Sequence, residues 1–239
     1  MRPTTAHPWS RDPVPGIAVV VTGMALAGFL LLTAAVLFFP AFQALDARLS
    51  AAVRSISWGP LEALARGLTF MGDGWTMTAL TVAAAAYLVA GRRRAEAALL
   101  VATMALGTSA GALLKEAVER SRPGLEAARI PIPETYSFPS GHALAAFLYF
   151  GIAAFLFFVL ARSVRVKLWA WFACSVLAFG IALSRVYLGV HYLGDIIASW
   201  MLGSAFLTVS VAVYVWWITR TGAGTARAES EPGTTRAAG

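Results

Sequence analysis

The chain has 239 residues, of which 59% are hydrophobic and only 13% are charged, whereas a soluble domain usually carries about 25% charged residues. This composition excludes an ordinary soluble domain and indicates a protein with most of its chain in a membrane. The net charge of +7 does not indicate nucleic-acid binding, because the basic residues fall between apolar runs rather than in one stripe. The single cysteine, Cys174, excludes an intrachain disulfide.

Six apolar runs are long enough to cross a bilayer as helices, which predicts one all-α bundle with no separate soluble domain. The first run ends in Phe-Phe-Pro rather than in a small-residue cleavage site, so it is predicted to be a retained span and not a signal peptide. We expect a membrane-embedded unit over 16–218, a cytoplasmic segment over 1–15 and a disordered cytoplasmic tail over 219–239. The predicted spans are 16–39, 68–91, 95–116, 141–161, 167–187 and 192–218.

Two segments between the spans differ from the apolar runs. Residues 40–67 are too polar to cross a bilayer, and Leu45, Leu49 and Val53 recur there at helical spacing. This pattern indicates either a helix that lies in the membrane interface or a packed helix within a loop. Residues 118–139 form the longest loop, and their four prolines argue against one continuous helix.

The distribution of Lys and Arg among the loops predicts the orientation of the bundle. With the N-terminus inside, the inner segments hold 11 of these residues and the outer segments hold 8. The strongest marker is the run of three arginines at 92–94, between two closely spaced spans. Both termini are therefore expected in the cytoplasm of a multi-pass cell-membrane protein. Three stretches rich in polar and charged residues, 115–123, 139–142 and 184–195, are then expected on the outer side.

The stretch 139–142 reads PSGH and precedes an apolar run. Ser140 is a suitable helix cap, and Gly141 lets the backbone approach a ligand closely. Free amides at a helix N-terminus bind anions, and His142 would lie in the first turn beside such an anion. The alternative is a helix cap followed by an interfacial histidine.

The stretch 184–195 contains His191 and Asp195, four residues apart, so on a helix the two side chains share a face. A carboxylate bonded to one imidazole nitrogen fixes the tautomer and leaves the other nitrogen free to attack. Arg185 lies six residues before His191, near the same end of the bundle. The alternative is a capping aspartate beside an interfacial histidine.

The stretch 115–123 supplies Lys115 and Arg122, whose side chains suit phosphoryl oxygens. The alternative is that Lys115 extends to the membrane interface and that Arg122 is solvated in the loop. We expect Arg120, Glu116 and Glu119 to be solvated or interfacial charges of this ordinary kind. Taken together, cations and imidazoles that border the membrane on one side predict an anionic substrate, and a lipid phosphate fits best.

These three stretches resemble the three-part signature of the type 2 phosphatidic acid phosphatase (PAP2) superfamily, KxxxxxxRP, PSGH and SRxxxxxHxxxD. No signature position departs, and the resemblance covers roughly residues 60–218. It implies a PAP2/haloperoxidase-like core of the bacterial integral-membrane type. The matching positions are Lys115, Arg122, Pro123, Pro139, Ser140, Gly141, His142, Ser184, Arg185, His191 and Asp195.

The resemblance also implies a role for each matched residue. His191 would be the nucleophile that forms a phosphohistidine, and Asp195 would orient it. His142 would protonate the leaving oxygen and then activate water. No cofactor is implied, and three neighbouring cations would oppose a metal at the two histidines and the aspartate. The phosphoryl group would be held by Lys115, Arg122, Ser140, Gly141 and Arg185.

Three residues outside the signature are candidate substrate contacts. Asp73 lies in a Met-Gly-Asp-Gly sequence and either shapes the mouth of the site, where it could bind a headgroup, or caps a helix. Tyr136 and Phe138 precede the PSGH stretch and either pack against a lipid or anchor the chain at the interface.

We therefore expect a lipid phosphatase that hydrolyses a phosphomonoester or diphosphate at the outer face of the membrane. Undecaprenyl diphosphate, phosphatidylglycerol phosphate and phosphatidate are the candidate substrates, membrane lipids are the expected partners, and the oligomeric state stays open. One alternative transfers the phosphate to another lipid. Another is an anion transporter, which the one-sided clustering and the lack of a mid-membrane broken-helix repeat oppose. Vanadium haloperoxidases share the pocket motif but are soluble, and the six apolar spans of this chain argue against such an enzyme.

Overall fold

The computed structural model describes residues 14–221, and both the predicted segment 1–15, except for its last two residues, and most of the predicted tail 219–239 lie outside them. Within the described range the chain is helical, as predicted. The helices are α1 (Val14–Phe38), α2 (Pro40–Arg54), α3 (Gly59–Met71), α4 (Gly74–Ala90), α5 (Arg94–Val118), α6 (Gly141–Leu160), α7 (Val164–Tyr187) and α8 (Leu193–Thr221), with a 3-10 turn, η1, at Leu125–Ala127.

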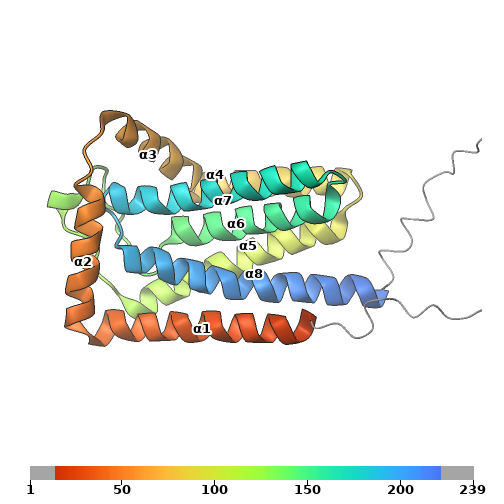
Figure 1. The fold of residues 1–239 in the computed structure, drawn as a ribbon, viewed down its shortest axis with the longest axis horizontal. Helices are drawn as coiled ribbons and strands as arrows, with labels where there is room; N and C mark the ends of the chain where they lie inside the picture. Colours follow the sequence, from red (N-terminus) through yellow and green to blue (C-terminus); the bar gives the residue numbers. More distant parts are fainter. Residues whose placement is uncertain (1–13, 222–239) are drawn as a thin grey trace, which may run out of the picture.

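Helices α1, α4, α5, α6, α7 and α8 run along the long axis of the molecule, and α2 and α3 lie at one end (Figure 1). Five of the six, α1, α5, α6, α7 and α8, are long and apolar enough to cross a membrane, and α4 is a shorter apolar helix. Helix α6 packs against α5, α7 and α8, while α1 packs on the outside of α8. Helix α2 lies across the end of the bundle, and α3 packs over α7 near the same end (Figure 1).

Small residues bring α5 close to the central helix α6. An added Cβ at Gly107 would lie 2.3 Å from Leu148, and one at Gly111 would lie 2.6 Å from Leu144. Both leucines are buried in the core. Because only glycine permits this approach, the last turn of α5, with Lys115, is held beside the first turn of α6.

The predicted span 68–91 is wrong in its first part, because the chain breaks between α3 and α4. The Asp73 carboxylate accepts a hydrogen bond from the backbone N–H of Trp75 at 3.0 Å and so caps α4. Gly72 fits against the α7 side chain Ile181, where an added Cβ would lie 2.4 Å from a methyl group. Helix α4 therefore has 17 residues and a length of about 26 Å, and its role as a sixth span stays a prediction.

Helix α2 confirms a helix within residues 40–67 and has a polar buried side. Asp46 and Ser50 are buried, whereas Leu45 and Leu49 are about half exposed, at 52% and 49%. A packed loop helix would bury its leucines, so this arrangement favours a helix that lies in the membrane interface.

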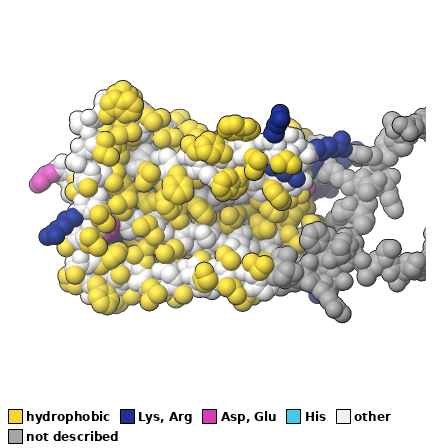
Figure 2. Space-filling view, in the orientation of Figure 1, with side chains coloured by type: hydrophobic (Ala, Val, Ile, Leu, Met, Phe, Trp, Pro, Cys, Tyr) yellow, Lys and Arg dark blue, Asp and Glu magenta, His cyan; other side chains and the backbone are white. Residues whose placement is uncertain are grey.

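The surface agrees with a multi-pass membrane protein. Apolar side chains cover the long sides of the bundle, and charged side chains gather toward its two ends (Figure 2). The three signature stretches lie at the end covered by α2, whereas the arginines at 92–94 lie in and after the α4–α5 connection at the other end. Which end faces the cytoplasm stays a prediction.

The loop over 118–139 contains only the turn η1, which confirms that it is not one helix. Its middle is fixed to the bundle, since the Arg129 N–H donates to the Leu188 carbonyl at 2.9 Å. The Arg129 side chain also stacks on the ring of Tyr187 and donates to the Arg54 carbonyl.

Candidate active site

Four helix ends and two loops meet at the end of the bundle beneath α2. Helices α5 and α7 end there, and α6 and α8 begin there. They bring together the predicted site residues, which lie far apart in the sequence. The guanidinium of Arg122 reaches His191, the side chain of Lys115 lies next to Gly141, and the charges of Lys115, Arg122 and Arg185 all act on His142.

The two ring nitrogens of His191 have different partners. Nδ1 lies 3.1 Å from the Asp195 carboxylate, and Nε2 lies 3.0 Å from Nη1 of Arg122. A guanidinium only donates, so Nε2 must be the accepting nitrogen and the proton belongs on Nδ1. Burial lowers the pKa of His191 to about 3, against the opposing effect of Asp195. The ring is therefore neutral near pH 7, with the Nε2 lone pair on the side of Arg122.

Asp195 is completely buried and uses both of its oxygens. Oδ2 accepts hydrogen bonds from His191, from the hydroxyl of Ser137 and from the backbone N–H of Tyr192. Oδ1 accepts a hydrogen bond of 2.6 Å from Nη1 of Arg120. Such a carboxylate cannot rotate without losing several bonds, so it fixes the position and the tautomer of His191.

Three cations lie on the side of the site away from Asp195, and apart from the contact of Arg122 with His191 their hydrogen-bond partners are neutral oxygens. Arg122 donates to the carbonyls of Thr135 and Val190, at 2.6 and 2.8 Å. Lys115 donates to the carbonyl of Tyr136 at 2.8 Å. Burial lowers the pKa of Arg122, with the charge of Asp195 acting in the opposite direction.

Arg185 is the most constrained of these cations. It is 3% exposed, its Nη1 donates to the Thr69 hydroxyl at 2.5 Å, and its Nε is buried without a partner. Among residues 14–221, no carboxylate lies within salt-bridge distance of Arg185, Arg122 or Lys115. Three cations with unmatched charge favour a multiply charged anion in their midst.

The first turn of α6 completes the site. Ser140 is buried and caps the helix by accepting from the Ala143 N–H at 3.4 Å. Gly141 is exposed, and an added Cβ there would meet only the Lys115 side chain, at 3.9 Å. His142 is partly exposed beside it. The open backbone at a helix N-terminus is suited to receive an anion.

The three candidate substrate contacts lie in different environments. The Asp73 carboxylate serves as the helix cap described above, and a headgroup role for it stays a prediction. Tyr136 is partly buried, and its carbonyl accepts from both Lys115 and Arg122. Phe138 is fully buried and packs on Phe29 at 5.9 Å between ring centroids. This burial corrects the expectation that Phe138 contacts a lipid or anchors the interface.

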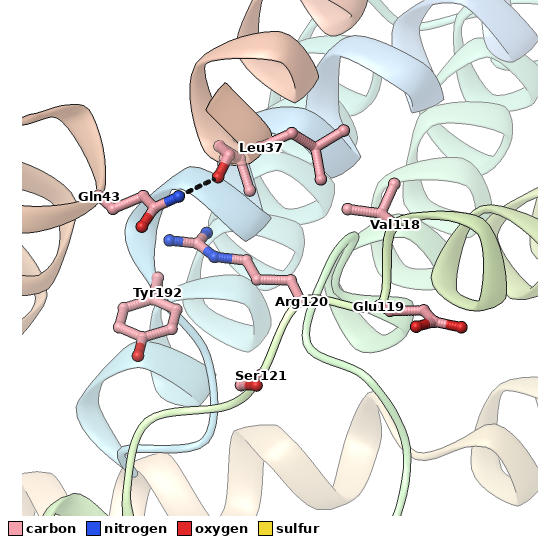
Figure 3. A pocket seen from close by; sticks show the side chains of 8 residues that line it. Leu37, Gln43, Val118, Glu119, Arg120, Ser121 and Tyr192 are labelled. Carbon is pink, nitrogen blue, oxygen red and sulfur yellow. Dashed lines mark hydrogen bonds between the residues drawn. The ribbon is translucent and has the colours of Figure 1, made fainter. Parts of the chain in front are cut away.

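Arg120 is the main residue that the sequence led us to misplace. It was expected in solvent, but its side chain is 10% exposed and bridges two buried carboxylates, Asp195 and Asp46 of α2. It also stacks on the ring of Tyr192 at 4.2 Å and lines a cavity of about 330 Å³ beside Gln43 (Figure 3). Glu116 and Glu119 are exposed, as expected.

Asp46 and Ser137 were not singled out as site residues from the sequence. The only available signal for Asp46 was its position on the polar side of an amphipathic helix, and Ser137 simply precedes the PSGH stretch by one residue. Their proximity to Asp195 depends on how α2 and the long loop fold back, which no local spacing encodes.

Apolar helices that end in a neutral imidazole and unmatched cations define a multi-pass membrane protein with a site suited to an anion. The comparison with known families identifies it further. The model of the PAP2 superfamily matches residues 96–219, and the chain belongs to this superfamily. The resemblance found in the three sequence stretches is thereby confirmed.

The relatives include both sequences and a solved structure. Phosphatidylglycerophosphatase B of Bacillus subtilis is 31% identical over 176 residues, which cover 73% of this chain and 86% of the relative. An undecaprenyl-diphosphatase of Sulfolobus acidocaldarius is 39% identical over 83 residues, covering 34% of this chain and 36% of the relative. The crystal structure of a transmembrane PAP2-type phosphatidylglycerolphosphate phosphatase from Bacillus subtilis superposes with a TM-score of 0.73 at 28% identity, covering 80% of this chain and 94% of the other.

Proposed function

We propose that this protein hydrolyses a phosphomonoester or diphosphate of a membrane lipid through a phosphohistidine at His191. The observation that carries the proposal is the arrangement around that ring. Nδ1 is held by Asp195, and Nε2 faces the unmatched cations through Arg122. An arriving phosphate would take its place among these cations with its phosphorus near the Nε2 lone pair.

In the first step, Nε2 of His191 attacks phosphorus and the bond from phosphorus to the lipid oxygen breaks. The leaving oxygen takes a proton from His142, which the negative charge of the bound phosphate would keep protonated against the neighbouring cations, so the lipid departs as an alcohol or a lipid monophosphate. Lys115, Arg122 and Arg185 stabilise the charge on the transferring group. Asp195 stabilises the positive charge that the imidazole acquires.

In the second step, water attacks phosphorus and gives a proton to His142, which returns to its protonated form. The bond between phosphorus and Nε2 breaks, and its electron pair returns to the ring. Inorganic phosphate leaves. Division into two displacements lowers the barrier of each, and the fixed cations supply the charge stabilisation without a metal.

The choice of substrate rests on the relatives and on the position of the site. Their names refer to phosphatidylglycerophosphate and to undecaprenyl diphosphate, and both are lipids with a terminal phosphate. The site lies at the end of apolar helices, where a lipid headgroup would be found. The arginines at 92–94 at the other end support an outward-facing site by the positive-inside rule.

The test is phosphate release by the purified protein in detergent. The substrates are undecaprenyl diphosphate, phosphatidate and phosphatidylglycerol phosphate, each with EDTA present. The His191→Ala variant removes the nucleophile. The Ser204→Ala variant is the matched control, because among residues 14–221 that hydroxyl bonds only to the Trp200 carbonyl within α8.

We expect release that survives EDTA, disappears in His191→Ala and is unchanged in Ser204→Ala. Full release by His191→Ala would overturn the assignment of the nucleophile. Loss of activity in EDTA that added metal restores would overturn the metal-free mechanism. Loss of lipid phosphate that appears on a second lipid rather than in solution would show phosphotransfer instead of hydrolysis.

A further inference from the structure

The side of Asp195 that faces away from His191 is occupied by charged groups that the signature does not include. Nη1 of Arg120 donates to Asp195 at 2.6 Å, and Nη2 donates to Asp46 at 2.8 Å. The exposed fractions of the Arg120, Asp46 and Asp195 side chains are 10%, 3% and 0%. We call these three residues the rear cluster.

Helix α2 is connected to the start of α8 by two further hydrogen bonds. The other oxygen of Asp46, Oδ1, accepts from the Gly194 N–H at 2.9 Å. The hydroxyl of Ser50, one turn further along α2, accepts from the Leu193 N–H at 2.9 Å. An added Cβ at Gly194 would lie 2.6 Å from the Asp46 carboxylate, so only glycine admits this contact. Helix α2 thus caps the helix that carries Asp195.

We propose that Asp46 is a positioning residue for the reaction, which acts through Arg120 to keep Asp195 oriented and negatively charged toward His191. This inference rests on the proposed phosphohistidine mechanism and assigns a role to α2, which lies outside the three signature stretches.

The charge balance of the rear cluster explains why two acids are needed. Arg120 alone would neutralise Asp195, and a neutral pair would stabilise a charged imidazole poorly. With Asp46 included, two carboxylates share one guanidinium and the cluster keeps a net charge of −1. The fork of an arginine can bond to both acids at once, which the single ammonium of a lysine cannot do with the same geometry. His191 becomes positively charged when Nε2 is phosphorylated while Nδ1 keeps its proton, so the extra negative charge favours this step.

Asp46→Asn removes the charge and keeps the size, but its amide oxygen can accept only one of the two hydrogen bonds that Asp46 accepts, from Arg120 and from the Gly194 N–H. We expect kcat to fall on the order of tenfold, with KM nearly unchanged, since Asp46 does not touch the phosphate site. Arg48→Gln is the matched control, because Arg48 is an exposed residue on the same helix, and it should keep the wild-type kcat. Arg120→Lys is the second variant and should also lower kcat.

A purely structural role is distinguished by repeating Asp46→Asn in an Asp195→Asn background under single-turnover conditions. A residue that acts through Asp195 should have less than a twofold effect there, because its target has already lost its charge. An equal effect in both backgrounds, or a kcat within twofold of the wild type for both Asp46→Asn and Arg120→Lys, would overturn the proposal. Activity that persists in His191→Ala would instead overturn the proposed function, so the two failures are distinguishable.

Discussion

The two sides of His191 differ in the way their charges are balanced. On the side of Nε2, Arg122 and its neighbouring cations bond to carbonyl and hydroxyl oxygens, with no carboxylate within salt-bridge distance in the described part of the chain. On the side of Nδ1, the single cation Arg120 lies between two buried carboxylates. The cations on the Nε2 side lack nearby negative charge, whereas the cation on the Nδ1 side is already balanced by carboxylates of the protein.

This difference indicates that the Nε2 side binds the anionic substrate and that the Nδ1 side holds His191 in position. Buried cations without counter-ions destabilise a resting protein, and an anion that enters among them removes that cost. A buried arginine with two carboxylates is satisfied before any substrate arrives, so it holds the geometry. Changes on the Nε2 side should therefore affect activity more than stability, and changes in the rear cluster should affect both.

The largest expected effect is on stability, from Arg120→Gln. The substitution leaves two buried carboxylates, Asp46 and Asp195, without their shared cation. Removal of one partner of a buried ion pair costs about 3–5 kcal/mol, and we expect a loss of this size in the free energy of unfolding in detergent. The exposed Arg48→Gln should change it little. An Arg120→Gln variant as stable as the wild type would show that the bridge in the rear cluster contributes nothing.

On the other side of the ring, Arg122→Ala should lower kcat by about 10²–10³-fold, the range for removal of one preformed donor to a developing charge. The guanidinium contacts His191 and would contact the phosphoryl group. The unfolding temperature should stay close to that of the wild type. A large loss of stability together with a small loss of kcat would reverse the division between the two sides.

Acidification should weaken the fold through His191. Its pKa is about 3 in the folded protein and about 6.5 in an unfolded chain. Between these values the unfolded chain binds a proton that the native protein does not, so stability falls as the pH falls below about 6.5. The slope contributed by this group is up to about 1.4 kcal/mol per pH unit. Unfolding of the wild type and of His191→Gln at pH 7, 6 and 5 measures it, and equal slopes would contradict a neutral buried imidazole.

The smallest expected effect is a gain in stability from Lys115→Met. Lys115 is partly buried near the like charges of Arg122 and Arg185, which Asp195 and Glu116 offset only in part, so its removal should stabilise the resting protein by about 1 kcal/mol while activity is lost. Millimolar inorganic phosphate should raise the unfolding temperature of the wild type more than that of the variant. A variant that is less stable than the wild type in the absence of phosphate would show that Lys115 is balanced by another group.

The sequence alone was sufficient to predict the features of this protein that depend on local sequence pattern. Apolar runs located the long helices, and the fixed spacing of the signature located His191, His142 and the three cations. The sequence offered Asp73 as a helix cap, and the structure confirms the cap, but the predicted span 68–91 ran through the break at Gly72, because hydropathy over a long window hardly changes at one glycine and one aspartate. Arg120 was misassigned for a different reason. Whether an arginine near a helix end is solvated or buried depends on which acids fold over it, and Asp46 lies 74 residues earlier.

Detection of the phosphohistidine at His191 is the most direct test of the proposed mechanism. The purified protein would be mixed with a phosphate-labelled lipid substrate, quenched in base after one turnover, and digested for mass spectrometry. We predict one phosphoryl group on the peptide that contains His191, with none in His191→Ala and normal labelling in Ser204→Ala. Turnover with the label on another residue, or labelling of His191→Ala at the wild-type level, would contradict the central claim that His191 is the nucleophile between an anion-binding side and a supporting side.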